Sequence, residues 1–390
     1  MKLIYIWCVL SMIVPSYAIE QTVNLESYSR FKPSIISESA IVMDADTGNI
    51  LFDKNSTKPT PPASLAKMMT MYIASEAIKS HVFELDSEIP VSSHAANMPG
   101  SKMFIADSQK ILGKDLVQGI IVSSGNDIAV ALAEFISGSE DAFTDLMNAK
   151  AQELGMSQTS FANPTGLHHE TMTSSAYDLA ILSRALIHDF PDFYSWYKQK
   201  SFTYNEIKQY NRNRLLHLST DTDGIKTGFT SEAGYCLASS TIRNGRRLIV
   251  VTMKAPSEKA RYDDHLKLIN YAYREFDNVQ VFDKDELIEE TRIWFGQRKT
   301  LPIVAEHSVI ATIPKSQQQN IQVDLLLDPT ITAPITKGTV VGKMNVTLDG
   351  QTIQMVDVIA QETVEKGSWI SRQADQLSLW SQKIKLFYLS

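Results

Sequence analysis

Apolar residues recur every three or four positions from Leu65 onward, in LAKMMTMYIASEAI, and predict a helix that begins just after Ser64. Two prolines and an alanine directly upstream prevent this helix from extending further back. The pattern stays mostly helical to about residue 190, with loops at SSHAANMPGSK and SFANPTGLHHETMTS. We therefore expect a largely helical first half of the chain.

Strand patterns flank the helical region. SAIVMDADTGNILFDKN places two apolar runs around Thr47-Gly48, which indicates a hairpin. GYCLASSTI and RRLIVVTMKA flank Arg243-Asn244-Gly245, and Asn-Gly between two apolar runs is the strongest short-range hairpin signal. HLKLINYAYREF, 265–276, is expected to be a closing helix. Strands at both ends with helices between them predict an α+β domain with an antiparallel sheet.

The pattern changes again between residues 279 and 364. Short alternating runs such as HSVIATIP and IQVDLLLD are broken by Pro, Gly and Asp. They predict a small all-β domain, arranged as a sandwich. Catalytic residue types do not cluster in this region of the sequence, so we expect it to act in spacing or docking.

The last segment, 368–390, has apolar residues at helical spacing and basic residues on other sides. The apolar positions are Ile370, Ala374, Leu377, Trp380, Ile384 and Phe387. Aromatic side chains on one face with nearby basic residues predict an amphipathic helix that lies in a membrane surface. The alternative is a helix packed on its own β domain.

The first 18 residues, MKLIYIWCVLSMIVPSYA, combine a basic Lys2, an apolar run and a small-x-small ending. This pattern predicts a secretory signal peptide that is cleaved after Ala18, and a retained membrane anchor is the alternative. Residues 19–35 are expected to be a poorly ordered lead-in. Cys236 is the only cysteine after the predicted cleavage site, which excludes an intramolecular disulfide, and we expect it to be buried.

Composition adds two constraints. The chain has 390 residues, of which 44% are hydrophobic and 21% are charged, and its formal net charge is −7. This length allows one large domain and a smaller one in an ordinary globular protein. A net acidic chain is a poor candidate for general nucleic-acid binding, so no nucleic-acid partner is expected.

Ser64 and Lys67 are the first candidate catalytic pair. Serine is a weak nucleophile that needs a base within hydrogen-bond reach, and residues three apart on a helix share a face. A neutral lysine would be that base if burial and neighbouring positive charge lowered its pKa. Backbone N–H groups at the helix start could also stabilise an oxyanion. Alone, the pair also fits an N-cap serine and a surface lysine.

Two further segments change that balance. SSGNDIAV supplies Ser124 and Asn126, a hydroxyl and an amide that could face one cleft across a loop. DGIKTGFT supplies Lys226, Thr227 and Gly228, where a lysine and a hydroxyl can bind a carboxylate and the glycine lets a substrate lie against a strand edge. In this order, and in an exported chain, the three segments together favour catalysis over separate turn and strand-end residues.

These motifs make the chain resemble the low-molecular-mass penicillin-binding proteins, the serine-type D-Ala-D-Ala carboxypeptidases of bacterial peptidoglycan metabolism. The resemblance includes PASLAKMMT, SSGND, FANPTGL, YNRNRLL, DGIKTGFT with EAGYCL, the β domain with WFG and LDGQTI, and the terminal amphipathic segment. It implies a signal peptide (1–18), a carboxypeptidase domain (19–276), a β domain (279–364) and an anchoring helix (368–390). It further implies an exported enzyme on the periplasmic face of the inner membrane, held by lipid contacts of its C-terminal helix.

The resemblance also implies roles for residues at matching positions. Ser64 resembles the nucleophile that forms the acyl-enzyme, and Lys67 the base that activates it. Ser124 matches the group that relays a proton to the departing D-alanine, and Asn126 the residue that holds the peptide. The expected substrates are peptidoglycan pentapeptide stems, and β-lactam antibiotics are expected covalent inhibitors.

The remaining matches concern substrate binding. Lys226 and Thr227, with Gly228 beside them, resemble the group that binds the terminal carboxylate. Backbone N–H groups of Ser64 and Phe229 would form the oxyanion hole. Arg261 matches an arginine that helps to bind the carboxylate, and a salt bridge from Arg261 to Asp263 or Asp264 is the alternative.

Two positions depart from the family pattern. The residue after Lys-Thr-Gly is often histidine in this family, but here it is Phe229. Some relatives carry histidine in the loop where this chain has Thr165. The deacylation rate is therefore the property that the resemblance predicts least directly.

Other functions compete with this interpretation. A serine β-lactamase would need a carboxylate with a nearby asparagine before the Lys-Thr-Gly strand, and Glu170 is followed by TMT, so only weak penicillin hydrolysis is expected. DD-endopeptidase action needs a roomier cleft, which the sequence leaves open. A non-catalytic cell-wall-binding scaffold has no need for a lysine beside the serine. His168 and His169 are adjacent and point to different sides, so we expect no metal site and no cofactor.

Overall fold

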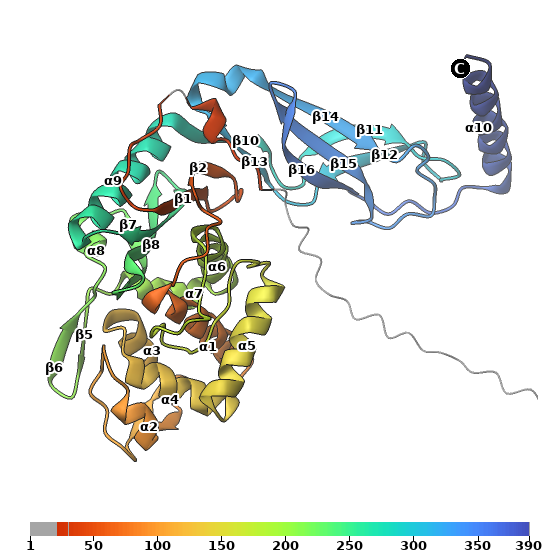
Figure 1. Cartoon of the computed structure of the whole chain (residues 1–390). Coiled ribbons are helices and arrows are strands. Elements are labelled where there is room, and N and C mark those ends of the chain that lie inside the picture. Colours follow the sequence, from red (N-terminus) through yellow and green to blue (C-terminus); the bar gives the residue numbers. More distant parts are fainter. Residues whose placement is uncertain (1–21, 30, 390) are drawn as a thin grey trace, which may run out of the picture. The chain divides into compact units, whose positions relative to one another are not determined.

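The computed structural model describes residues 22–29 and 31–389, with side chains described as far as residue 381 (Figure 1). The predicted signal peptide, 1–18, lies outside the described residues. The chain forms two compact units. The larger unit comprises Val23–Gln280 and Ile310–Asn320, and the smaller unit comprises Val281–Val309 and the chain from Ile321 onward.

A five-stranded antiparallel sheet forms the framework of the larger unit, with the strand order β2-β1-β9-β8-β7. Both predicted hairpins are present in it. β8 and β9 are joined by Asn244 and Gly245, whose positive φ angles of 52° and 80° are those of a tight hairpin turn. The strands are β1 (Ser39–Asp44), β2 (Ile50–Lys54), β7 (Thr222–Thr230), β8 (Gly234–Arg243) and β9 (Arg246–Ala255).

Helices cover this sheet and build the rest of the larger unit (Figure 1). The α+β prediction is thereby confirmed. The helices are α1 (Lys67–Lys79), α2 (Ser93–Asn97), α3 (Gly113–Val122), α4 (Asn126–Ser137), α5 (Glu140–Glu153), α6 (Ala176–Asp189), α7 (Pro191–Tyr194), α8 (Leu215–Leu218) and α9 (Glu258–Glu275). Two short hairpins pair β3 (Glu88–Pro90) with β4 (Lys110–Leu112) and β5 (Ser201–Tyr204) with β6 (Ile207–Tyr210).

α1 is the central helix of the larger unit. The apolar pattern predicted a helix just after Ser64, and α1 begins at Lys67, after a 3₁₀ turn, Ala63–Ala66. All of its residues except Glu76 and Lys79 are buried, because it packs against α3, α4, α5 and α6. A helix that is apolar nearly all round is stable only inside a core. The segment that carries Ser64 and Lys67 is therefore fixed from several sides.

Two sequence predictions about the larger unit are wrong in detail. The closing helix begins at Glu258, seven residues before the predicted start, because Ser257 caps it by accepting a hydrogen bond of 3.1 Å from the Ala260 N–H. The described part of the lead-in is also ordered. Leu25 is fully buried, and its N–H donates to the Ile50 carbonyl at 2.7 Å.

The predicted all-β region is confirmed, and its strands form one five-stranded sheet and one two-stranded ladder rather than two sheets of similar size. The larger sheet has the order β11-β12-β16-β15-β14, and the ladder pairs β10 with β13. The strands are β10 (Phe276–Phe282), β11 (Leu287–Arg292), β12 (Thr300–Ala305), β13 (Val309–Pro314), β14 (Ile321–Leu327), β15 (Val340–Leu348) and β16 (Gln351–Ala360). Most of β13 belongs to the larger unit, where Thr312 Oγ1 lies 2.6 Å from Thr47 Oγ1.

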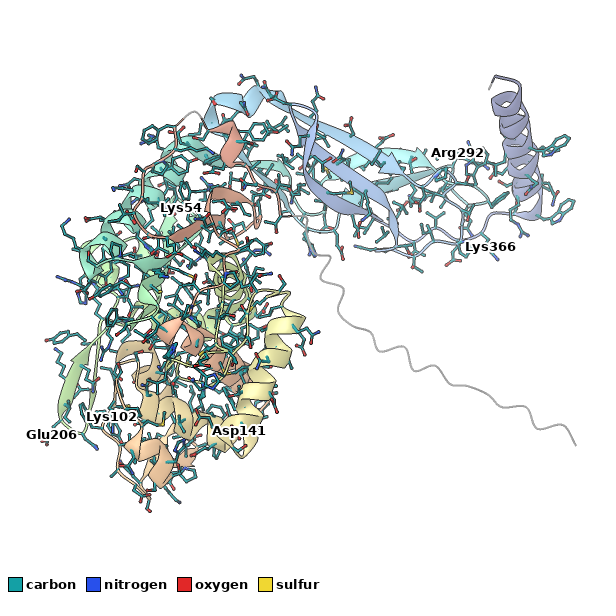
Figure 2. All side chains as sticks on the ribbon, viewed as in Figure 1. Lys54, Lys102, Asp141, Glu206, Arg292 and Lys366 are labelled. Atoms are coloured by element: carbon teal, nitrogen blue, oxygen red, sulfur yellow. The ribbon has the colours of Figure 1, made fainter. Side chains whose placement is uncertain are left out.

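The terminal helix α10 spans Trp369–Leu389 and is attached to the smaller unit through a buried carboxylate. Asp375 accepts hydrogen bonds of 2.8 Å from Arg292 and from the Phe295 N–H, and of 3.0 Å from Lys299. Arg292 is labelled in Figure 2. Ile370, Leu377 and Trp380 are instead 66–75% exposed. Over the described residues, none of the helices has the length and apolar character that a bilayer span requires.

Candidate active site

Ser64 lies in the 3₁₀ turn that leads into α1 and remains partly exposed. The backbone around it is tightly confined. Ala63 has a positive φ of 48°, a conformation that non-glycine residues adopt only when the surroundings enforce it. Gly166, at φ +79°, packs against this turn so closely that a Cβ there would lie 1.9 Å from the Ala63 carbonyl oxygen. The nucleophile candidate therefore sits on a backbone fixed by the loop before α6.

Lys67 is the residue that the structure brings to Ser64. Its side chain is fully buried, and its Nζ lies 3.3 Å from Ser64 Oγ. The same Nζ donates to Asn126 Oδ1 at 2.6 Å and to the Thr165 carbonyl oxygen at 2.5 Å. Burial is the main cause that lowers the pKa of Lys67; together with the lowering charge of Arg212 and the opposing charge of Asp127 it brings this pKa to about 7.

The geometry around Lys67 Nζ has a chemical consequence. A neutral amine has two N–H donors and one lone pair, and here two carbonyl-type acceptors take the two donors. The remaining position on the nitrogen, that of the lone pair, faces Ser64 Oγ. With a pKa near 7, a large fraction of Lys67 is neutral at physiological pH, and its lone pair is then directed at the serine hydroxyl.

Ser124 and Asn126 stand at the start of α4 on a turn with unusual backbone. Ser124 has a φ of 61° and is 1% exposed, and within the described part of the chain its Oγ has no hydrogen-bond partner. Both ends of the Asn126 amide are used, because Nδ2 donates to the Pro99 carbonyl at 2.6 Å. A buried hydroxyl without a partner is costly unless it serves another purpose, such as contact with a bound molecule.

β7 is an edge strand, and its free edge lies beside the nucleophile turn. A Cβ at Gly228 would lie 3.0 Å from the Pro62 carbonyl oxygen and 3.2 Å from the Ser64 nitrogen. Only a residue without a side chain lets the strand approach this closely. Thr227 is 6% exposed, and Phe229, the next residue but one, is 55% exposed. The three sequence motifs therefore meet at one place.

Positive charge is concentrated around this place. Lys226 is 4% exposed, and its Nζ donates to the Thr227 carbonyl at 3.0 Å. Burial holds the pKa of Lys226 well below its usual value, and the charges of Lys67, Arg212 and Arg261 lower it further. Cations packed together in this way are stabilised by an arriving anion, so the site is suited to a carboxylate.

Arg261 lies on α9 and is 4% exposed. Its guanidinium donates to the Cys236 carbonyl at 3.3 Å and to the Tyr262 hydroxyl at 2.9 Å, and it lies 3.5 Å from Glu258. The alternative prediction, a salt bridge from Arg261 to Asp263 or Asp264, is wrong. Asp263 pairs with Lys259, and Asp264 accepts hydrogen bonds from the backbone and hydroxyl of Ser37.

Several site residues were not assigned a role from the sequence. Arg212 is exposed, and its Nε donates to the Ser123 carbonyl at 3.1 Å. Thr165 contributes a backbone oxygen, which no side-chain pattern reveals. The buried Asp127 accepts from the Met103 and Phe104 N–H groups at 2.9 Å and so fixes the loop that faces α4. Motif spacing identifies the candidate nucleophile and the candidate base, but folding alone brings these supporting groups to them.

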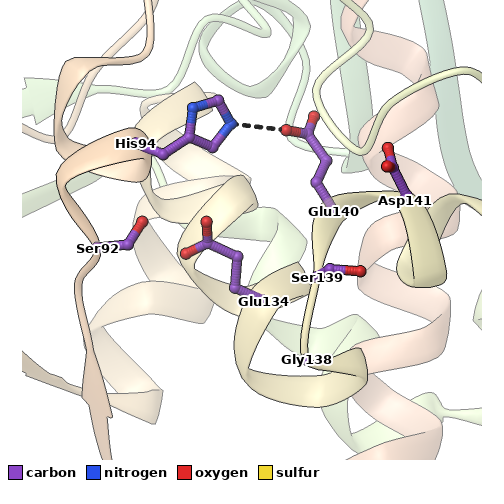
Figure 3. A pocket seen from close by; sticks show the side chains of 7 residues that line it. All are labelled: Ser92, His94, Glu134, Gly138, Ser139, Glu140 and Asp141. Carbon is purple, nitrogen blue, oxygen red and sulfur yellow. Dashed lines mark hydrogen bonds and ion pairs between the residues drawn. The ribbon is translucent and has the colours of Figure 1, made fainter.

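Two other features of the larger unit lie outside this site. Cys236 is fully buried, as expected, and burial raises the pKa of its thiol to about 11. Figure 3 shows a separate pocket lined by residues of α2, α4 and α5, in which His94 Nε2 lies 2.9 Å from Glu140. That pocket contains no serine–lysine pair, and the contact between His94 and Glu140 connects α2 to the start of α5.

Fold and site together fit a serine hydrolase in which a buried lysine amine lies beside the serine hydroxyl. Comparison with known proteins identifies the family. The family model described as D-alanyl-D-alanine carboxypeptidase matches residues 26–257, and the model for the C-terminal domain of penicillin-binding protein 5 matches residues 276–366. The chain belongs to the D-alanyl-D-alanine carboxypeptidase family.

Individual relatives agree with this membership. D-alanyl-D-alanine carboxypeptidase DacC of Escherichia coli is 36% identical, over 92% of this chain and 90% of the relative. The structure of penicillin-binding protein 5 from Haemophilus influenzae is 36% identical with a TM-score of 0.82, over 87% of this chain and 100% of that one. Penicillin-binding protein D2 from Listeria monocytogenes in its cefotaxime-bound form is 29% identical with a TM-score of 0.58, over 63% and 100%.

Proposed function

We propose that this enzyme removes the terminal D-alanine from peptidoglycan pentapeptide stems through an acyl-enzyme on Ser64. The observation that carries the proposal is the position of Lys67 Nζ, 3.3 Å from Ser64 Oγ, with two other acceptors already bound to it. Family membership supports the reaction class, and this geometry supports Ser64 as the nucleophile and Lys67 as its base.

Acylation follows from these positions. Neutral Lys67 takes the Ser64 proton while Oγ bonds to the carbonyl carbon of the penultimate D-alanine. The oxyanion of the tetrahedral intermediate is held by the backbone N–H groups of Ser64 and Phe229, which lie on the nucleophile turn and the adjoining strand edge. The C–N bond then breaks, and the Ser124 hydroxyl relays a proton to the departing amine. Water hydrolyses the resulting ester and restores Ser64.

Substrate binding uses the positive charge of the site. The terminal carboxylate of the stem would be bound by Lys226 and the Thr227 hydroxyl, with the charge of Arg261 nearby. Gly228 leaves room for the peptide beside the strand. An anion bound there would also stabilise the protonated form of Lys226, whose charge is unfavourable in the empty site.

The same chemistry accounts for covalent inhibition. A β-lactam presents a strained amide and a carboxylate, so Ser64 would open the ring and remain acylated. The cefotaxime-bound relative supports this part of the proposal. Glu170 is exposed and belongs to a turn, which gives no support to a β-lactamase mechanism with rapid deacylation.

The direct test measures D-alanine released from diacetyl-L-Lys-D-Ala-D-Ala. The wild type should release one D-alanine per peptide over many turnovers, and Ser64→Ala should release none. Turnover by Ser64→Ala would overturn the assignment of the nucleophile. A cross-linked dimeric stem, supplied separately, tests the endopeptidase alternative. The relatives that match most of the chain are named carboxypeptidases, which does not favour this alternative. A scaffold without catalysis would release nothing from either substrate.

We further propose that the protein is exported and held at the inner membrane by α10. The apolar side chains at Ile370, Leu377 and Trp380 are exposed, whereas the Asp375 side chain is buried and hydrogen-bonded to Arg292 of the smaller unit. The alternative of a helix packed by its apolar face on the β domain gains no support from this arrangement. Such a helix would bind the interface of a bilayer without spanning it.

Sedimentation with lipid vesicles tests the membrane proposal. Full-length protein should sediment with vesicles that contain anionic lipid, and protein lacking 368–390 should stay in solution while it still releases D-alanine from soluble peptides. The double variant Leu377→Ser with Trp380→Ser should lose most vesicle binding. Gln373→Ser with Gln376→Ser, on exposed polar positions of the same helix, is the matched control. Vesicle binding by the truncated protein would contradict the proposal.

A further inference from the structure

An exposed aromatic side chain stands at the end of the strand that carries the proposed carboxylate-binding residues. Phe229 is 55% exposed, although the four residues before it, Ile225 to Gly228, are all buried. A single exposed apolar residue is ordinary on a protein surface. The position of this one is unusual, because it directly follows Lys226, Thr227 and Gly228 on the edge that faces Ser64.

The Phe229 ring is held in place from one side. Phe229 is paired with Tyr235 across the β7–β8 ladder, and the two ring centroids are 4.4 Å apart with an interplanar angle of 37°. The buried Arg261 guanidinium lies 5.6 Å from the Tyr235 ring, and Arg261 is itself fixed by the Cys236 carbonyl and the Tyr262 hydroxyl. One face of Phe229 is therefore ordered by packing, while more than half of its surface remains available.

Phe229 shares a face of β7 with Thr227. Side chains two residues apart on a strand point to the same side, about 7 Å from each other. The Thr227 hydroxyl is proposed to bind the terminal carboxylate of the substrate. The side chain of that terminal residue is attached to the same carbon atom as the carboxylate. A carboxylate bound at Thr227 would therefore bring this side chain within reach of the Phe229 ring.

We propose that Phe229 and Tyr235 form an apolar subsite for the side chain of the leaving residue. The subsite selects terminal D-residues with an apolar side chain over glycine, and it disfavours a charged side chain, which would lose water against the ring. The inference rests on the proposed function and concerns the specificity of that reaction. It assigns Phe229 a side-chain role in addition to its backbone N–H.

The test compares kcat/KM for diacetyl-L-Lys-D-Ala-X, where X is glycine, D-alanine, D-leucine or D-glutamate. In the wild type, D-alanine should be preferred over glycine by a factor that includes about fourfold for the buried methyl group. Phe229→Ala should reduce that ratio about fourfold. It should reduce the ratio of kcat/KM for the D-leucine peptide to that for the D-glutamate peptide by a larger factor. Phe229→Tyr, which keeps the ring, should retain the wild-type ratios, and Phe229→His should lose the preference over D-glutamate.

Ratios within one variant do not depend on how much of it is folded, so a structural defect alone leaves them unchanged. Phe31→Ala is the matched control, because Phe31 is 54% exposed and lies under Arg274 at 4.9 Å, away from the site motifs. Unchanged ratios in Phe229→Ala overturn the subsite while leaving the proposed function intact. A wild type that releases no terminal residue from any of the four peptides overturns the proposed function itself.

Discussion

The side-chain oxygen of Asn126 lies 2.6 Å from Nζ of Lys67, and the two residues are 59 positions apart in the chain. Together with the Thr165 carbonyl oxygen, this acceptor determines where the Lys67 lone pair points when the amine is neutral. The amide of Asn126 is in turn held by the Pro99 carbonyl. We therefore propose that Asn126 positions the proposed base in the free enzyme, in addition to the role in peptide binding that the family resemblance implies.

Replacement of Asn126 tests this positioning. Asn126→Ala removes the acceptor, so the Lys67 amine is free to rotate away from Ser64, and the rate of acylation by penicillin should fall about 100-fold. Asn126→Asp places a negative charge beside Lys67, which raises the lysine pKa and moves the pH midpoint of acylation upward. Stopped-flow acylation between pH 5.5 and 9.5 measures both effects. Asn97→Ala, on the exposed part of α2, should change neither, and an unshifted midpoint in Asn126→Asp would show that this contact does not act on the base.

Gly166 offers a test of the backbone that supports Ser64. Alanine there meets two penalties, the positive φ of 79° and an approach of 1.9 Å between Cβ and the Ala63 carbonyl oxygen. Gly155→Ala is the matched control, because its φ is 75° and nothing lies within 4 Å of its Cβ. The control should lose about 1–2 kcal/mol of unfolding free energy from φ alone.

Gly166→Ala should lose more stability than Gly155→Ala in urea denaturation, and it should also slow acylation, because the Thr165 carbonyl beside it binds Lys67. The control should acylate at the wild-type rate. Equal losses of stability in the two variants, with unchanged acylation, would mean that the loop before α6 shifts to accommodate the methyl group without moving the turn that carries Ser64.

Asp375 should control how firmly α10 is attached to the smaller unit. Burial alone would raise the pKa of this carboxyl, but hydrogen bonds from Lys299 and the Phe295 N–H and the charges of Lys299 and Arg292 lower it below its ordinary value of 3.8. A carboxyl with a lowered pKa stabilises the attachment above its ordinary pKa, and this contribution is lost as the pH falls through the lower value of the attached state.

Hydrogen exchange of the α10 amides reads this attachment directly. Asp375→Asn should increase exchange at neutral pH, because Arg292 and Lys299 then face a neutral amide. Wild-type protein should show the same loosening only below about pH 4. Asp357→Asn removes a more exposed partner of Lys343 and serves as the control, with an expected effect of less than about 1 kcal/mol. Identical exchange in both variants would contradict the role of Asp375.

The sequence was sufficient for the parts of this account that depend on local pattern. The start of α1 after Ser64, the hairpins at Thr47-Gly48 and Asn244-Gly245, and the α+β and all-β regions all follow from periodicity and turn residues. The helix α9 begins earlier than its apolar periodicity predicts, because its first two turns, EKARYDD, are mostly polar and its start depends on the cap at Ser257. The lead-in is held by backbone hydrogen bonds of Val23 and Leu25 with Ile50, long-range contacts that no local signal encodes.

The site was predictable only as far as its motifs. Ser-x-x-Lys places an amine beside a hydroxyl by helix geometry alone, and that contact is present. The second acceptor on Lys67 is a backbone oxygen, and Arg212 reaches the site from a loop between β6 and α8. The charge of such a residue is visible in a sequence, but the group that it approaches is set by tertiary packing.

The most direct test of the central claim is the pH dependence of penicillin acylation, with the adduct mapped by intact-mass and peptide mass spectrometry. If neutral Lys67 is the base, the acylation rate rises about tenfold per pH unit below its midpoint, and it levels off above about pH 7, where the lysine is mostly neutral. The account predicts this profile together with a single adduct on Ser64. A rate that is flat or falls between pH 5.5 and 9, or an adduct on any other residue, would contradict it.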